Sequence, residues 1–240
     1  MSGHSKFHNI KKTKDKADAA RGKIFTKIGR EIAVAVKAGG ADPSTNNKLA
    51  DVIAKAKSNN MPNDSITRSI KKASGEINAI NFDSVSYEGY GPGGVAFLVE
   101  CLTDNRNRTA GDVRHLFDKF GGSLGTSGSV SYMFEQKGVI VVEATDGLTE
   151  EKMFEIAIDA GADDLQTEDD NFIIYTTARD MHAVRDAIAQ SGIQIASADV
   201  EYIPSNYIVP TDDQRERLEK LYDGLEDLDD VQEIYHNGDF

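Results

Sequence analysis

The chain has 240 residues, of which 39% are hydrophobic and 28% charged, and a formal net charge of −13 at pH 7. This composition excludes an intrinsically disordered chain, and the length favours two or three small domains over one core. No apolar run approaches the ~20 residues needed to cross a bilayer, and the N-terminus lacks the apolar region of a secretory signal, so we expect a cytoplasmic protein without membrane contact.

Charge is divided unevenly along the chain. Residues 1–75 carry 16 Lys and Arg against 6 Asp and Glu, a formal charge of +10, whereas residues 76–240 carry 11 against 34, a formal charge of −23. A cationic segment of this kind predicts a surface for a polyanion, in particular a nucleic acid. Because phosphate repels the acidic remainder, binding should be oriented and sensitive to salt.

The cationic segment has the periodicity of helices. Apolar side chains four residues apart (Ile24, Ile28, Ile32 and Val36) predict a helix that ends at Gly39-Gly40. A second helix should follow Asp42-Pro43, and a third should run from near Asn63 to Gly75, which gives a three-helix bundle. On the first helix, Lys23, Lys27 and Arg30 form a stripe beside the apolar one, and we expect this stripe to be exposed to solvent.

The pattern changes to strands after Gly75. Strands over Val85 to Tyr90 and Val95 to Leu102 flank a glycine-rich turn, then a helix closes at Gly121-Gly122 and a strand is expected near Ser129 to Glu135, in the order β-β-α-β. Cys101 lies in the second strand and has no partner for an intramolecular disulfide. We therefore expect a buried structural thiol in a reducing compartment.

Residues 138–203 predict a β-α-β-β-α-β order, which is the ferredoxin-like unit. A helix over about 212–225 and a strand over 231–235 then supply what the incomplete unit at 82–135 lacks. We therefore expect an α+β protein with a basic helical domain (1–78), a discontinuous α+β domain (79–136 plus 204–240) and a ferredoxin-like domain (137–203) inserted in it.

No motif predicts catalysis, a metal or a cofactor. The run Gly89-Tyr90-Gly91-Pro92-Gly93-Gly94 fits a dinucleotide fingerprint, but a strand follows it where a helix is required, which favours a hairpin turn. The histidines lack the partners of a metal site or a triad, and the acidic runs, including Asp227 to Asp230, are typical of solvated faces.

The segment Thr103-Asp104-Asn105-Arg106-Asn107-Arg108-Thr109 stands at a strand-to-helix junction. Asp104 or Asn105 is suited to cap the helix. Arg106 and Arg108 have two interpretations that the sequence does not separate: they remain available to an anion, or they form an internal clamp with carboxylates.

We expect the nucleic-acid interface to lie in the first helix and in the segment before it, which we call the N-terminal arm and which contains His4 to Lys14. Phosphate would be held by Lys and Arg side chains, with two further side chains touching bases and the two junction arginines contributing. The predicted set comprises Lys6, Lys11, Lys12, Lys14, Arg21, Lys23, Lys27 and Arg30 for phosphate, His4 and Phe7 for bases, and Arg106 and Arg108.

Several separate segments, in order along the whole chain, closely resemble the YebC/PmpR family, which includes the mitochondrial translational activator of cytochrome c oxidase. They are Gly3-His4-Ser5-Lys6, Arg21-Gly22-Lys23-Ile24-Phe25-Thr26-Lys27, Asn59-Asn60-Met61-Pro62, Tyr87 to Gly94, Thr103 to Thr109 and Asp230 to Asn237. Many members have Trp where this chain has Phe7, which keeps an aromatic anchor with a smaller stacking surface.

The resemblance implies three domains, with the last inserted in the middle one, and it implies no enzymatic activity. Bacterial members are described as DNA-binding transcriptional regulators, and other members point to the ribosome and to relief of stalling at proline-rich stretches. Two functions therefore stay open: a DNA-binding regulator, or a translation factor that contacts ribosomal RNA by shape. A hydrolase built on the carboxylates is a third hypothesis.

Overall fold

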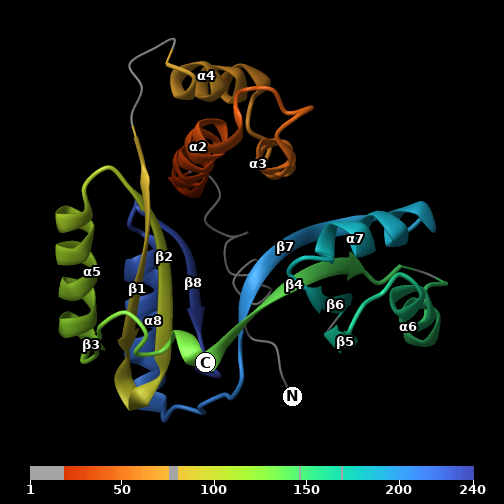
Figure 1. Ribbon diagram of the computed structural model, residues 1–240. Coiled ribbons are helices and arrows are strands. Elements are labelled where there is room, and N and C mark those ends of the chain that lie inside the picture. The colour runs from red at the N-terminus through yellow and green to blue at the C-terminus, as the bar shows by residue number, and fades with distance from the viewer. Residues whose placement is uncertain (1–18, 76–80, 146, 169) are drawn as a thin grey trace. The chain divides into compact units, whose positions relative to one another are not determined.

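The computed structural model describes residues 19–75, 81–145, 147–168 and 170–240, and it forms two compact units (Figure 1). One unit spans Tyr132–Asn206. The other combines the described residues before it with Tyr207–Phe240, so the chain leaves this unit after Ser131 and returns to it at Tyr207. Helices and two four-stranded sheets make this an α+β protein with a helical N-terminal region, as the sequence predicts.

Three helices build the N-terminal region: α2 (Ala19–Gly39), α3 (Asn47–Ser58) and α4 (Asn63–Ala73). Their apolar faces meet in one core, in which Ile28, Ile32 and Leu49 are fully buried. The Asn46 side chain caps α3 by accepting a hydrogen bond from the Leu49 backbone N–H at 3.1 Å. Asn60 turns the chain between α3 and α4 with φ of 58°, a left-handed conformation that asparagine tolerates.

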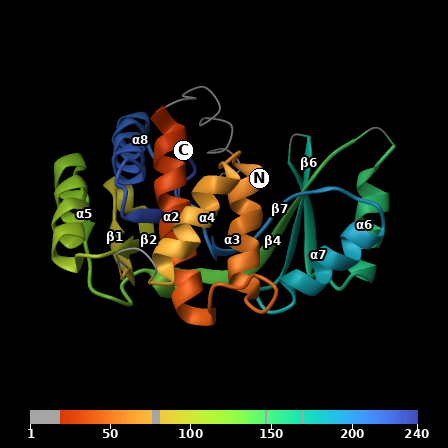
Figure 2. The same cartoon turned by 90° about the horizontal axis from the view of Figure 1, so that it is seen from above.

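The first sheet has the strand order β3-β1-β2-β8 and is antiparallel throughout. Two helices, α5 and α8, pack side by side against it (Figures 1 and 2). Phe97 of β2, Phe117 of α5 and Leu221 of α8 are fully buried at their junction. The elements are β1 (Asp83–Tyr90), β2 (Ala96–Thr103), α5 (Arg106–Phe120), β3 (Ser123–Leu124), α8 (Asp212–Glu226) and β8 (Val231–His236).

The β1–β2 hairpin confirms the interpretation of the glycine-rich run as a turn. Gly93 and Gly94 have φ of 73° and 79°, and Tyr90 pairs with Ala96 directly across the turn. Such positive φ values favour glycine, which explains Gly93 and Gly94 as turn residues. The buried Cys101 lies in β2, and burial raises the pKa of its thiol to about 12, which fits a structural role.

The strand predicted near Ser129 to Glu135 is wrong as a member of this sheet. The carboxylate of Glu88 accepts hydrogen bonds from the backbone N–H groups of Gly128 (2.8 Å), Val130 (2.7 Å) and Ser131 (2.8 Å). These donors are thereby withdrawn from strand pairing, and the short β3 pairs with β1 instead.

The unit of residues Tyr132–Asn206, from here on the second unit, contains the predicted β-α-β-β-α-β order. Its strands are antiparallel, in the order β5-β6-β4-β7. Its two helices pack on one core with the sheet, around the buried Ile140, Met153, Ile174 and Ile188. The elements are β4 (Phe134–Glu143), α6 (Glu150–Asp159), β5 (Asp164–Glu168), β6 (Asn171–Thr177), α7 (Met181–Gln190) and β7 (Ile195–Pro204).

Within the described ranges, no helix combines the length and the apolar character that a membrane span requires.

Candidate nucleic-acid interface

Half of the predicted interface falls outside the residues that the structure describes. These are the arm residues His4, Lys6, Phe7, Lys11, Lys12 and Lys14. The rest of the predicted set lies on α2 and at the start of α5, with Arg21 exposed in the first turns of α2.

The cationic stripe of α2 (Lys23, Lys27 and Arg30) contacts hydrogen-bond acceptors that lie near the C-terminal end of the same unit. Lys23 Nζ lies 2.6 Å from an Asp227 carboxylate oxygen, and Lys27 Nζ donates to the backbone carbonyl of Glu226 at 3.1 Å. Burial lowers the pKa of Lys27, although the carboxylate of Glu226 opposes this effect. The stripe thus makes internal contacts at its first two positions.

Arg30 completes the stripe, and its side chain is 13% exposed. Its guanidinium forms an ion pair with Asp230, donates to the backbone carbonyl of Leu102 at 2.8 Å, and lies 5.2 Å from the ring centroid of Phe82. Charge, hydrogen bond and ring contact together fix the guanidinium in place.

Asp230 is the centre of a polar cluster that joins α2, β2 and α5. Besides Arg30, it accepts hydrogen bonds from Arg108 Nη2 at 2.8 and 3.0 Å, from Thr109 Oγ1 at 2.6 Å and from Thr103 Oγ1 at 3.2 Å. Burial disfavours its charge, but the bonds from Thr109, Arg108 and Arg30 outweigh burial and lower the pKa of Asp230 to about 2. The carboxylate is therefore ionised and fully bonded.

Two expectations from the sequence are wrong here. The stripe of Lys23, Lys27 and Arg30 was expected to be exposed, yet Lys27 and Arg30 are partly buried because acidic and carbonyl groups from distant parts of the chain cover them. Asp230 was expected on a solvated face, but its side chain is 8% exposed because two arginines and two threonines surround it. Whether the stripe binds a nucleic acid stays a prediction.

At the start of α5, Arg106 and Arg108 form ion pairs with carboxylates of this chain, which is the second of the two interpretations that the sequence allowed. Arg108 pairs with Asp104 at 2.8 Å as well as with Asp230, and these two hydrogen-bonded carboxylates raise its pKa. Arg106 Nε lies 3.2 Å from an Asp83 carboxylate oxygen in a more exposed pair. Asn105 caps the helix by accepting from the Arg108 backbone N–H.

The interface predicted from the sequence omits a second cationic group, on α4. Arg68, Lys71 and Lys72 are exposed, and they stand opposite the side of α4 that carries the buried Ile66. We call these three residues the α4 face. Their spacing of three and four residues around a helix was available in the sequence as a signal.

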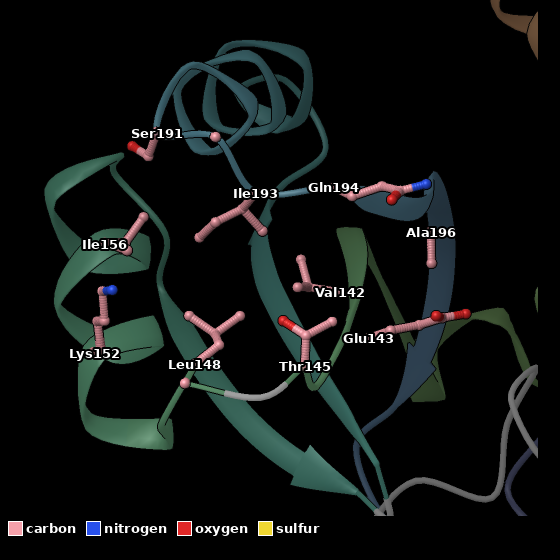
Figure 3. A pocket seen from close by; sticks show the side chains of 12 residues that line it. Val142, Glu143, Thr145, Leu148, Lys152, Ile156, Ser191, Ile193, Gln194 and Ala196 are labelled. Carbon is pink, nitrogen blue, oxygen red and sulfur yellow. The ribbon is translucent and has the colours of Figure 1, made fainter.

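The second unit has a cavity of about 480 Å³ between the end of β4, α6 and the α7–β7 turn (Figure 3). Apolar side chains of Val142, Leu148 and Ile193 stand in its middle, with Lys152 on the α6 side and Glu143 on the opposite side. Elsewhere too, the described residues form no cluster of three or more His, Cys, Asp or Glu side chains suited to a metal ion.

Fold and charge together define an α+β protein with a cationic helical N-terminal region. Residues 5–76 match the TACO1/YebC protein N-terminal domain, and residues 82–238 match the TACO1/YebC second and third domain. The chain belongs to the TACO1/YebC family, which confirms the resemblance seen in its motifs.

Relatives cover almost the whole chain. It is 57% identical over 238 residues to a "Probable transcriptional regulatory protein" of Acetivibrio thermocellus, which covers 99% of this chain and 98% of that one. A protein of the same name from Ruminiclostridium cellulolyticum is 58% identical over 238 residues, with 99% and 96% covered. Such names describe regulators of transcription, which are not a class of enzyme.

The fold also matches a solved structure. The crystal structure of a conserved hypothetical protein from Aquifex aeolicus superimposes with a TM-score of 0.84 at 44% sequence identity, and the match covers 92% of this chain and 91% of that chain.

Proposed function

We propose that this protein is a non-enzymatic, nucleic-acid-binding regulator of gene expression that acts in the cytoplasm by occupying DNA. The observation that carries the proposal is the segregation of charge: residues 1–75 hold 16 of the 27 Lys and Arg residues of the chain. Phosphate backbones supply most of the affinity in such interactions, and the described helices offer exposed cations for them. The names of the relatives support a role in transcription.

The N-terminal arm extends this proposed interface. Its lysines Lys6, Lys11, Lys12 and Lys14 would add phosphate contacts, and His4 and Phe7 would touch bases.

A ribosome-associated translation factor is the second candidate, and the acidity of the rest of the chain favours it. A segment with 34 Asp and Glu against 11 Lys and Arg is repelled by a long duplex, but it is compatible with a crowded surface that contains basic proteins. The contact would then read the shape of folded RNA.

Sedimentation through a sucrose gradient separates the two candidates. The purified full chain is mixed with ribosomes at physiological salt in the presence of excess duplex DNA. Migration with the DNA and loss from the ribosomes is the result expected for a transcriptional regulator. Retention on ribosomes despite the competitor would replace that function with the translational one, and migration with neither would overturn both.

A further inference from the structure

The cations of α4 are arranged on one face. At about 100° per residue, Arg68, Lys71 and Lys72 fall within a sector of about 100°, on the opposite side of the helix from Ile66 and Ile70. Since the isoleucines face the helical core, the three long side chains project away from it, and all three are exposed. Neighbours spaced like this lie about 5–6 Å apart at their Cβ atoms, which concentrates positive charge.

In the part of the chain that the structure describes, these three side chains have no paired carboxylate, in contrast to Lys23 and Arg30 of the α2 stripe. Within the described parts of the chain, none of the three forms an ion pair or a side-chain hydrogen bond. By comparison, Lys23 and Arg30 are paired with Asp227 and Asp230. Lys23 can leave the exposed Asp227 at little cost, but Arg30 must lose the buried Asp230 before it can neutralise a phosphate. An exposed, unpaired cation loses only water and counterions.

One acid shares the α4 face. Asp64 lies one turn before Arg68 in the first turn of the helix, where a negative charge favours the helix dipole. Lys71 and Lys72 lie in the last turn, where positive charge is favoured by the same dipole. Stabilisation of the helix ends is a purely structural role for these residues, and it predicts a change in stability, but no change in binding, when they are removed.

We infer that the α4 face is the principal phosphate-binding surface of the helical region, and that the α2 stripe instead holds the helical region to the acidic residues of its unit. The ligand is the phosphate backbone of a nucleic acid. This inference rests on the proposed function and moves its interface from α2 to α4.

The test is the salt dependence of binding, measured by fluorescence anisotropy with the full chain. The probes are a labelled DNA duplex of three helical turns and, separately, a labelled ribosomal RNA fragment. The variant R68A/K71A/K72A is compared with the control R114A/K119A/R179A, which removes three exposed cations of the same charge from the acidic part of the chain. Circular dichroism verifies that both variants fold.

The α4 variant should flatten the slope of log K against log salt by about 2–3 on duplex DNA, because each phosphate contact contributes about 0.9, and the control should not. Asp64→Asn should tighten binding. An unchanged slope in the α4 variant, or an equal change in the control, would overturn the inference while the proposed function stands. Absence of binding by the unmodified chain to either probe would overturn both.

Discussion

The two cationic groups of the helical region, the α2 stripe and the α4 face, have the same number of positive charges but different surroundings. Both place three Lys or Arg side chains on one side of a helix. The α2 stripe meets Asp227, Glu226 and Asp230 from the other end of the chain, whereas among the described residues the α4 face has Asp64, on its own helix, as its one acidic neighbour. Positive charge in a sequence therefore identifies a binding surface only after its internal partners are known.

Removal of Asp230 should have the largest effect on the α2 side of this comparison. Asp230→Ala leaves Arg30 enclosed without its carboxylate, and we expect the free energy of unfolding to fall by about 3 kcal/mol. Urea denaturation measures it, with the exposed neighbour Asp229→Ala as the control, expected to change stability by less than about 0.5 kcal/mol. Equal effects of the two substitutions would show that the cluster around Asp230 does not hold α2.

Acid should weaken the same cluster in a defined pH window. The pKa of Asp230 is lowered from 3.8 to about 2, so the folded state favours the ionised carboxylate. Its contribution, about 2 kcal/mol, is present above pH 4 and is lost as the pH falls through 2, because protons bind the unfolded chain first. The stability difference between the unmodified chain and Asp230→Asn should shrink over this window, and a constant difference would contradict the assignment.

Lys27 should contribute little, because burial lowers its pKa and thus disfavours its charged form. Lys27→Met keeps the aliphatic stem and removes the buried ammonium, so the free energy of unfolding should stay the same or rise by up to about 1 kcal/mol. The more exposed Lys23→Met serves as a matched control in the same denaturation experiment. A loss above about 1 kcal/mol at Lys27 would mean that its bond to the Glu226 carbonyl dominates.

The smallest effect on stability is expected on the α4 side. The variant R68A/K71A/K72A touches exposed side chains without partners in the described structure, so thermal or urea unfolding should shift by less than about 0.5 kcal/mol. A large loss would assign these residues to helix stability, and it would remove the contrast between the two groups.

The sequence predicted those parts of the fold that depend on local patterns. Four-residue apolar spacing found α2, and two strand-like runs on either side of the glycine-rich turn found the β1–β2 hairpin, but not its register. The strand expected near Ser129 does not form, because the carboxylate of Glu88, distant in sequence, accepts hydrogen bonds from the backbone N–H groups of this segment. The side chain of a distant residue leaves no signature in the local sequence.

The candidate site shows the same limit. Arg108 and Asp230 are separated by 122 positions. The sequence could therefore suggest that Arg108 pairs with an internal carboxylate, but it could not identify Asp230 as that carboxylate. Only the fold brings β8 and its preceding turn beside β2 and α5. The α4 face, by contrast, depends on one helix alone, and a helical projection of residues 63–73 was sufficient to find it.

Photocrosslinking at two matched positions shows whether the α4 face or the α2 stripe contacts the nucleic acid. Thr67 on α4 and Thr26 on α2 are both exposed threonines, each next to a cation of its group, and each is replaced in turn by a benzophenone-bearing amino acid in the full chain. The protein is irradiated with labelled duplex DNA or ribosomal RNA fragment. We expect a crosslinked product from position 67 and little or none from position 26. Crosslinking from position 26 without crosslinking from position 67 would contradict this expectation.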